Sequence, residues 1–493
     1  MFPLVTVTLF LPLAGCLLIA ALPHAAPRVA HTIGVVTSGL TLLGTLGVWT
    51  RGVGPGFTQV EQVPWIASLG TAYRVGVDGV SYPLVLLTAV LFLAALIYSV
   101  NVTDRARAYV ALFLLLETAC LGVFLALDMV LFYVFFEVTL VGMYFIIAGW
   151  GHAQRQRAAL TFFLYTLLGS LPLLLAILAL YLGGHPRTFD MRAVIAAPPL
   201  TGLAATLAFI AMFVTFAVKT PLFPLHTWLP LAHTEAPTAG SVVLAGVLLK
   251  LGAYGFIRFA LQMTPGAFHA LAPYVAALAV FSALYGAFVA LAQTDIKRLV
   301  AYTSVNHMGY VVLAVAAAAA ATDPAARTLA LDGATLQMVS HGVVTGALFL
   351  LVGALQDRTG TREMARFGGL LRVVPLLGWG FILAAFASLG LPGLAHFPAE
   401  FQIFLGSFRE WPWAVAIVIV GLVVTAGLYL RAIQQTFLGS PSERWKGLPD
   451  LGTRELWASA PLLLLTVAIG VAPGALLTVI HGTARLILGG SGV

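Results

Sequence analysis

Residues 211–258 read AMFVTFAVKTPLFPLHTWLPLAHTEAPTAGSVVLAGVLLKLGAYGFIR. Lys219 and Lys250 stand inside apolar sequence here, and four prolines interrupt the segment between them. A Lys at the centre of a bilayer costs about 2.5–3.5 kcal/mol on insertion scales. The whole chain has only four Lys, of which the other two are Lys297 and Lys446. Because a buried Lys can release its proton and an Arg effectively cannot, the pattern indicates titratable cations where water is scarce.

The composition is that of a polytopic membrane protein. Hydrophobic residues make up 60% of the chain and charged residues 9%, against about 25% charged in soluble domains. Basic cytoplasmic loops account for the net charge of +7 without a nucleic-acid partner. The two Cys, Cys16 and Cys120, exclude a disulfide framework and a Cys-based metal site. We expect no metal, flavin, haem or iron–sulfur cluster in this chain.

The beginning of the chain allows two interpretations. Leu13-Ala14-Gly15-Cys16 is similar to a lipoprotein processing site, so the first apolar run could be a signal peptide. A signal peptide needs a positively charged start, and no Lys or Arg precedes Cys16. We therefore expect residues 2–22 to be a retained transmembrane helix.

Apolar runs of about 20 residues span a hydrocarbon core of about 30 Å. Fourteen such runs predict an all-α polytopic fold with about 14 transmembrane helices. The runs are 2–22, 30–50, 78–99, 108–127, 129–149, 158–182, 203–224, 237–258, 270–293, 298–320, 329–355, 373–408, 412–438 and 455–480.

Two of these segments are too long for one straight helix. The segment from Arg372 to Arg409 would measure about 55 Å, and it contains Gly390-Leu391-Pro392-Gly393. Residues 202–237 are similarly long and broken by prolines. Non-helical backbone at membrane depth is tolerated only beside protein or water. Helices 7 and 12 are therefore predicted to be discontinuous, which points to an ion path and to two inverted five-helix repeats.

The layout predicts four regions. Residues 1–107 hold helices 1–3, residues 108–262 the first repeat (helices 4–8), residues 263–438 the inverted second repeat (helices 9–13), and residues 439–493 a loop and the C-terminal helix 14. With the N-terminus outside, fifteen Lys and Arg fall in cytoplasmic loops and eight on the opposite side. The positive-inside rule then places both termini on the non-cytoplasmic side of a bacterial-type cytoplasmic (inner) membrane.

Ionisable residues from five helices fall near one depth. Counting about 1.5 Å per residue from charged boundaries puts each of them about 12–15 Å deep, near the middle of the core. This row predicts a proton track in the membrane plane, although each group could also be a locally satisfied polar residue. The five residues are Glu137, Lys250, His307, His341 and Glu400, and Lys219 could join them at the break of helix 7.

The chemistry of these groups suggests their roles. A nearby Glu decides whether a buried Lys holds its proton, so Glu137 and Lys219 are candidates for a switching pair. Lys250, His307 and His341 can pass protons onward through water. Glu400, at the second broken helix, would be the terminal group.

Other polar residues leave the choice open. Glu117 could belong to the path or make a structural hydrogen bond. His226 and His233 could admit protons or cap broken backbone. For Lys297, the sequence favours an interfacial anchor paired with Asp295.

Several motifs stand out over roughly residues 78 to 440. They are Phe135-Phe136-Glu137, Val218-Lys219-Thr220-Pro221, Pro224-Leu225-His226-Thr227-Trp228-Leu229-Pro230, Ala232-His233-Thr234-Glu235-Ala236-Pro237-Thr238-Ala239-Gly240-Ser241, Leu248-Leu249-Lys250, Asp295-Ile296-Lys297-Arg298-Leu299, Tyr302-Thr303-Ser304, Asn306-His307-Met308-Gly309 and Phe397-Pro398-Ala399-Glu400-Phe401. Together they resemble the antiporter-like subunits of respiratory complex I. The acidic residue Glu400 resembles the M-type (chain 4) branch, whereas the L- and N-type relatives usually carry Lys there. The L-type's long lateral helix and its additional crossing are missing.

The resemblance implies a subunit of a proton-translocating NADH:quinone oxidoreductase that moves protons and has no redox active site of its own. NADH, FMN, iron–sulfur clusters and quinone would belong to partner subunits, and neighbouring antiporter-like membrane subunits would be partners. It also implies that Glu137 and Lys219 form the coupling pair, Lys250 is central, His307 and His341 continue the path, and Glu400 ends it.

Three other functions compete with this one. The first is a subunit of a multi-subunit cation/proton antiporter or a membrane-bound hydrogenase, which share this module. The second is a stand-alone solute carrier, which would need a substrate pocket. The third is a structural scaffold without a path.

Overall fold

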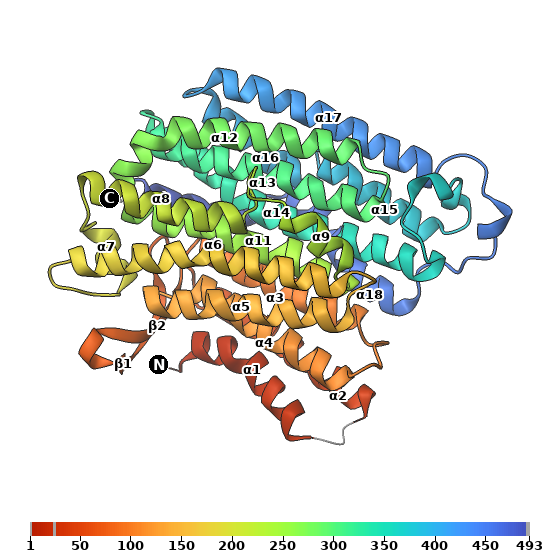
Figure 1. Cartoon of the computed structure of the whole chain (residues 1–493), viewed down its shortest axis with the longest axis horizontal. Coiled ribbons are helices and arrows are strands. Elements are labelled where there is room, and N and C mark those ends of the chain that lie inside the picture. Colours follow the sequence, from red (N-terminus) through yellow and green to blue (C-terminus); the bar gives the residue numbers. More distant parts are fainter. Residues whose placement is uncertain (1, 23–25, 490–493) are drawn as a thin grey trace.

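The structure, a computed structural model, describes residues 2–22 and 26–489 (Figure 1). Apart from one two-stranded sheet, its regular elements are helices. The elements are α1 (Leu4–Ala21), α2 (Pro27–Thr50), β1 (Thr58–Ile66), η1 (Ala67–Leu69), β2 (Thr71–Val77), α3 (Ser81–Tyr98), α4 (Ala106–Leu125), α5 (Met129–Trp150), α6 (Arg155–Gly183), α7 (Met191–Ala196), α8 (Gly202–Lys219), α9 (Trp228–Glu235), α10 (Thr238–Val243), η2 (Leu244–Leu248), α11 (Leu249–Gly255), η3 (Phe256–Leu261), α12 (Pro265–Leu291), α13 (Ile296–Ala320), α14 (Pro324–Thr359), η4 (Met364–Arg366), η5 (Leu370–Arg372), α15 (Pro375–Ser388), α16 (His396–Phe408), α17 (Pro412–Thr436), η6 (Glu443–Trp445), α18 (Thr453–Val471) and α19 (Gly474–Ile487).

Thirteen helices in the described residues are long and apolar enough to cross a membrane, counting Thr238–Leu261 as one. The shorter α15 and α16 together make a further, broken crossing. Both predicted breaks are confirmed. α8 ends at Lys219, where prolines without a backbone N–H follow. α15 ends at Ser388, two residues before Gly390, whose φ of 77° is a left-handed conformation that suits glycine.

The two predicted repeats share local details at the start of their second helices. Asp128 caps α5 and pairs with Arg74 at 2.7 Å. Asp295 caps α13 and pairs with Arg362 at 2.9 Å. In both cases, the first helical N–H bonds to the segment that follows the third helix of the repeat: Met129 to Phe189 and Ile296 to Arg362. The hydrogen bonds at the start of the second helix are thus alike in the two repeats.

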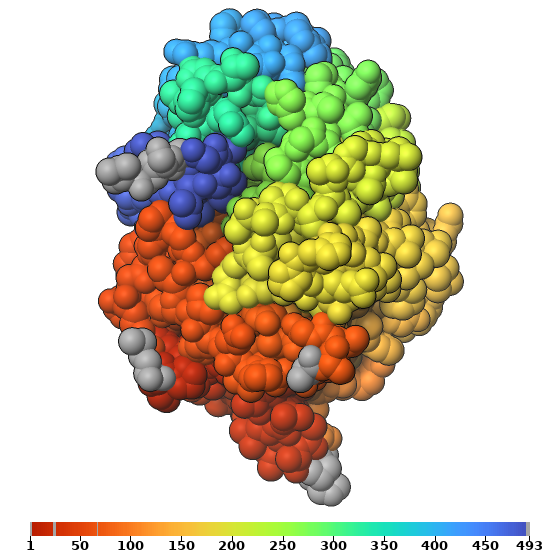
Figure 2. Space-filling model, turned by 90° about the vertical axis from the view of Figure 1, so that its left-hand side faces the viewer, coloured from red at the N-terminus to blue at the C-terminus, as the bar shows by residue number. Residues whose placement is uncertain are grey.

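The two faces of the bundle are defined by their loops. Phe2, the β1–β2 hairpin and α19 lie on one side, here called the terminal side, since Arg51 donates to the Phe2 carbonyl and Thr483 donates to that of Pro55. Figure 2 looks onto this side, with the hairpin, α7 and α19 at its surface. Asp128 begins α5 there, beside the hairpin, whereas Asp295 begins α13 at the opposite side, beside residues 362–363. The two repeats are thus inverted.

Two features differ from the sequence-based expectation. Residues 58–77 form an antiparallel hairpin with irregular register, in a segment for which no strand was expected. The last run does not end at residue 480 as one helix: α18 stops at Val471, and α19 continues from Gly474 to Ile487 after Pro473. A Cβ on Gly470 would lie 2.3 Å from the Gly393 carbonyl oxygen, so this interruption packs against the break between α15 and α16.

Candidate functional site

Lys219 occupies the last residue of α8, at the proline-rich break. Its side chain is 2% exposed, and its Nζ donates a hydrogen bond to Thr139 Oγ1 at 3.3 Å. The same nitrogen lies 4.8 Å from the centre of the Phe136 ring, within cation–π range. The ammonium is therefore held between the helix break and α5 by one hydroxyl and one ring.

Glu137 lies on α5 beside this ammonium and is only half-buried. Its carboxylate and Lys219 interact electrostatically, with Ser170 and Tyr133 beside the acid. Among the described residues, however, no salt bridge joins Glu137 to Lys219, and Glu137 Oε1 has no hydrogen-bond partner. The predicted switching pair is thus a pair of neighbours without a direct ion pair.

Lys250 is fully buried between two short π-helices, η2 and η3. π-Helical turns inside α-helices occur frequently at functional sites. The Lys250 Nζ donates to the Ala245 carbonyl and lies 2.7 Å from His341 Nδ1 on α14. A hydrogen bond therefore joins Lys250 and His341, which lie on helices from different repeats.

A second group of contacts continues from His341. The His341 and His307 ring centres are 5.6 Å apart, and both side chains are fully buried. His307 Nδ1 lies 3.3 Å from Glu400 Oε1, and its Nε2 lies 3.1 Å from Ser388 Oγ. Lys250, His341, His307 and Glu400, four of the five residues of the predicted row, thus form one continuous series of neighbours.

His396 was missing from the predicted set. It lies at the first residue of α16, fully buried, with its ring centre 4.6 Å from that of His307. Its Nδ1 is 3.7 Å from Glu400 Oε1. The sequence did carry a signal, because His396 and Glu400 are four residues apart and so face the same side of a helix. Gln337, which donates to Glu400 at 3.5 Å, was also missed.

Gly390 shapes the position of Glu400. A Cβ there would lie 2.5 Å from Glu400 Oε2, whereas a Cβ on Gly393 would meet nothing within 4 Å. Both glycines have positive φ, of 77° and 88°, so both Ala variants carry the same strain of about 1–2 kcal/mol. We expect Gly390→Ala to lower proton translocation about tenfold or more through displacement of the carboxylate.

The matched variant Gly393→Ala separates displacement from strain. Proton translocation by reconstituted complexes measures both, and Gly393→Ala should remain close to the unsubstituted chain. Equal losses in the two variants would show that backbone strain, and not the position of Glu400, is responsible.

A cavity of about 430 Å³ opens on the side opposite the termini. Lys297 lies next to it and is fully buried, and its Nζ donates to the Ala236 carbonyl at 2.7 Å. The interpretation of Lys297 as an interfacial anchor paired with Asp295 is wrong, because Asp295 caps α13 and pairs with Arg362. The cavity is lined by Gln154, Thr227, Pro230, Leu231, Thr234, Glu235, Gln293, Thr294, Asp295, Arg298, Tyr302, Arg362 and Glu363.

His233 on α9 is close enough to feel the charges of both Lys297 and Lys250. It interacts electrostatically with both, stacks on Phe349 at 4.8 Å, and neither of its ring nitrogens has a hydrogen-bond partner. Nearby, in the loop between α5 and α6, burial and then the charges of Lys297 and Arg362 lower the pKa of His152 to about 4. Near neutral pH the His152 ring therefore stays uncharged beside the cavity.

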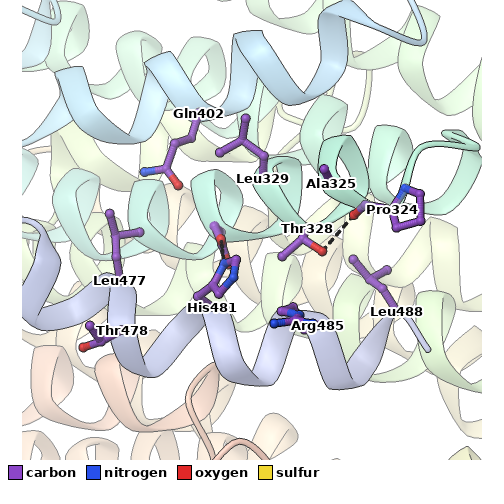
Figure 3. Close-up of a pocket in the computed structure, with 11 residues that line it drawn as sticks. Pro324, Ala325, Thr328, Leu329, Gln402, Leu477, Thr478, His481, Arg485 and Leu488 are labelled. Atoms are coloured by element: carbon purple, nitrogen blue, oxygen red, sulfur yellow. Dashed lines mark hydrogen bonds and ion pairs between the residues drawn. The ribbon is translucent and has the colours of Figure 1, made fainter. Parts of the chain in front are cut away.

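A second cavity, of about 820 Å³, opens on the terminal side between α14, α16 and α19 (Figure 3). At its wall the buried Asp332 pairs with the half-exposed His481 at 2.7 Å, while Asp332 Oδ1 has no partner. Arg485 and Gln402 also line it. Neither Asp332 nor His481 belonged to the predicted site.

The structure shows the local contacts of two residues whose roles the sequence left open, Glu117 and His226. Glu117 is fully buried and accepts a hydrogen bond from Ser38 at 3.0 Å, with its second oxygen unpartnered. His226 packs against Phe223 and Tyr285, with ring centres 5.8 Å and 5.0 Å away. Neither contacts the Lys250–Glu400 series.

The fold and the site together define a class of protein. Inverted repeats with broken helices in corresponding positions, and titratable side chains gathered at those breaks, are typical of ion-translocating membrane proteins. Lys219 and Glu400 lie at the two breaks.

Comparison with known proteins gives the family. Residues 126–426 match the family described as NADH:quinone oxidoreductase/Mrp antiporter, transmembrane. The chain is 41% identical to NADH-quinone oxidoreductase subunit M of Rhodobacter capsulatus, over 95% of this chain and 93% of that protein. It is 38% identical to subunit M of Escherichia coli strain K12, over 92% and 91%. The chain therefore belongs to the NADH:quinone oxidoreductase/Mrp antiporter family.

Solved structures agree. A chain of respiratory complex I from Thermus thermophilus with bound NADH matches with a TM-score of 0.89 and 34% identity, covering 99% of this chain and 100% of that one. A chain of the Mrp complex from Dietzia sp. DQ12-45-1b matches with a TM-score of 0.85 at 21% identity, covering 100% and 98%, which shows the shared fold alone. The predicted membrane fold of antiporter-like type is confirmed.

Proposed function

We propose that the chain is the M-type, antiporter-like subunit of a proton-translocating NADH:quinone oxidoreductase and that its buried Lys, His and Glu side chains carry protons. One observation carries the proposal: Lys250, His341, His307 and Glu400 lie in an unbroken series of contacts inside the bundle. Buried ionisable groups are expensive in a membrane and mark proton relays.

Each group in the series has a different task. Lys250 gives its proton to His341 along the 2.7 Å contact, and His341 passes a proton to His307, whose ring centre lies 5.6 Å away. His307 then passes a proton to Glu400 across 3.3 Å. Imidazole suits this because its two nitrogens can accept a proton on one side and donate on the other. Ser388 holds the His307 ring through the nitrogen that does not face Glu400.

Glu137 and Lys219 act as the coupling pair. Glu137 is half-buried at the edge of the bundle, so a neighbouring subunit can change its charge. Because Lys219 interacts electrostatically with Glu137, that change in charge alters the proton affinity of Lys219. Thr220, the residue after Lys219, packs closely against Gly252, two residues from Lys250, and its Oγ1 has no hydrogen-bond partner.

The two cavities supply the openings. Protons enter the polar cavity beside Lys297 and reach Lys250 by way of His233, which interacts with both lysines. They leave toward the terminal side, where α14 and α16 border the second cavity. We therefore propose that both termini lie on the non-cytoplasmic side, in keeping with the excess of Lys and Arg on the other.

The chain contributes no redox site of its own in this proposal. NADH oxidation and quinone reduction, with FMN and iron–sulfur clusters, take place in partner subunits. Exposed apolar side chains along α6, among them Leu168 (66%) and Leu175 (66%), suit contact with lipid or with neighbouring membrane subunits. Relatives that are named subunit M favour this assembly over a cation/proton antiporter. Purification of the native assembly and identification of its companion subunits decides between the two.

The function is tested by Glu137→Gln. We expect NADH-driven proton translocation in vesicles to fall about tenfold or more, because Gln cannot change charge. Glu137→Asp, which keeps the carboxylate, should retain a substantial part. Glu443→Gln, in an exposed loop pair with Lys446, is the matched control and should behave normally. Full translocation by the Glu137→Gln variant would refute the coupling role.

A further inference from the structure

His307, His396 and Glu400 form a compact set of potential metal ligands. One ligand atom from each residue lies within 4.8 Å of the others, and all three side chains are buried. The distances from Glu400 Oε1 to His307 Nδ1 and His396 Nδ1 are 3.3 Å and 3.7 Å. Tetrahedral Zn²⁺ with bonds of about 2.0–2.1 Å places neighbouring ligand atoms about 3.4 Å apart. The distance from His307 to Glu400 already matches this spacing. His396 Nδ1 lies 3.3 Å from the Ser388 carbonyl oxygen, so it carries the hydrogen and leaves Nε2 as the lone-pair nitrogen of that ring.

The surroundings favour ligation as well. Neither His307 Nδ1 nor His396 Nε2 has a hydrogen-bond partner. Buried polar atoms are normally satisfied, so these nitrogens are free to bind. Ser388 contacts His307 through Nε2 at 3.1 Å and thereby orients the ring with Nδ1 toward Glu400. Groups of this kind behind metal-binding histidines fix the ring orientation.

We propose that His307, His396 and Glu400 bind a divalent transition-metal ion of the Zn²⁺ type, and that this ion inhibits the subunit. The site rests on the proposed function only for its inhibitory effect and not for binding itself. Two imidazoles and one carboxylate suit Zn²⁺, whereas Mg²⁺ and Ca²⁺ prefer all-oxygen sites. Three ligands leave one coordination position for water.

Inhibition follows from the chemistry of ligation. A metal ligand must be deprotonated, so bound Zn²⁺ would occupy the lone pairs of both imidazoles and the charge of Glu400 at once. A proton arriving from His341, whose ring centre is 5.6 Å from His307 and 6.1 Å from His396, would meet no free acceptor. The ion would thus compete with protons, and raising the proton concentration should weaken its effect.

His396 distinguishes this site from an ordinary proton relay. The series from Lys250 to Glu400 is complete without it, since His307 already contacts Glu400. His396 adds the third ligand from the first turn of α16, one turn before Glu400 on the same helix. Removing His396 should therefore affect metal binding more than it affects the other contacts of the series.

Binding is tested on the purified, intact complex with ZnCl₂ alone. After removal of loosely held metal, zinc content and X-ray absorption at the zinc edge are compared between the unsubstituted chain and His396→Asn. We expect one additional zinc per complex, bound through two imidazole nitrogens, in the former and its loss in the latter. Equal zinc content and the same spectrum in both would overturn the site. Because this readout does not depend on pumping, it stands even if the proposed function fails.

Inhibition is measured as the zinc concentration that halves proton translocation, relative to the zinc-free rate of each variant. His396→Asn should raise it at least about 10–100-fold, since loss of an outer-shell partner of a metal ligand already costs that much. His185→Asn, which removes an exposed loop histidine outside the proposed path, is the control and should leave it unchanged. The same zinc sensitivity in His396→Asn and the unsubstituted chain would assign inhibition to another place in the complex. If His396→Asn does not assemble, His396→Gln replaces it.

Discussion

Replacing Lys250 by Arg is expected to reduce NADH-driven proton translocation about tenfold or more, although the positive charge is kept. Lys250 is fully buried and bonded to His341 at 2.7 Å, so its role depends on giving up a proton. Arg cannot be deprotonated in a protein, and a fixed charge at this point blocks the series. The measurement is proton uptake by reconstituted vesicles during NADH oxidation.

Two control experiments accompany the Lys250→Arg variant. Lys446→Arg is the same substitution in an exposed loop, where Lys446 pairs with Glu443, and should leave translocation unchanged. NADH oxidation with an artificial electron acceptor reports whether the complex has assembled. Normal translocation by the Lys250→Arg variant would show that release of a proton from residue 250 is not needed.

Glu400→Gln is expected to have an effect of similar size. Gln fills nearly the same space beside Gly390 and Gln337 but can neither take a proton from His307 nor release one. Since proton transfer by a positioned side chain contributes about 10²–10⁴-fold, translocation should fall by at least about tenfold. Proton uptake in the same vesicles measures the loss.

Glu400→Asp provides the comparison for this residue. It keeps a titratable group but shortens the side chain, so translocation should be intermediate, with His396 remaining as a neighbour. Full activity in Glu400→Gln, or equal loss in Gln and Asp variants, would contradict a role for its proton and favour a purely structural one.

The sequence predicted the broken helices because their causes are local. Proline lacks an N–H, and Gly390 can adopt a positive φ that other residues avoid. Lys250, His307 and Glu400 could also be found, since charged residues in apolar runs are costly enough to indicate a use. These inferences need only the residue types and their positions along one helix.

Other features depend on contacts between distant segments. Lys297 lies near the start of a helix at a charged boundary. It is nevertheless buried, because the Ala236 carbonyl accepts a hydrogen bond from its ammonium group. The β1–β2 hairpin forms where Asp128 binds Ala72 and Arg74, more than 50 residues away. His396 was overlooked because its importance comes from His307 on another helix, although its spacing from Glu400 was visible.

Water positions in the intact complex test the central claim most directly. A structure of the assembled complex, at a resolution that shows ordered water, should place water between Lys219 and Lys250 and around the two histidines that lead to Glu400. Each gap would then be short enough for one water molecule to bridge. A dry, apolar barrier between Lys219 and Lys250, in every state of the turnover cycle, would contradict proton movement along this row.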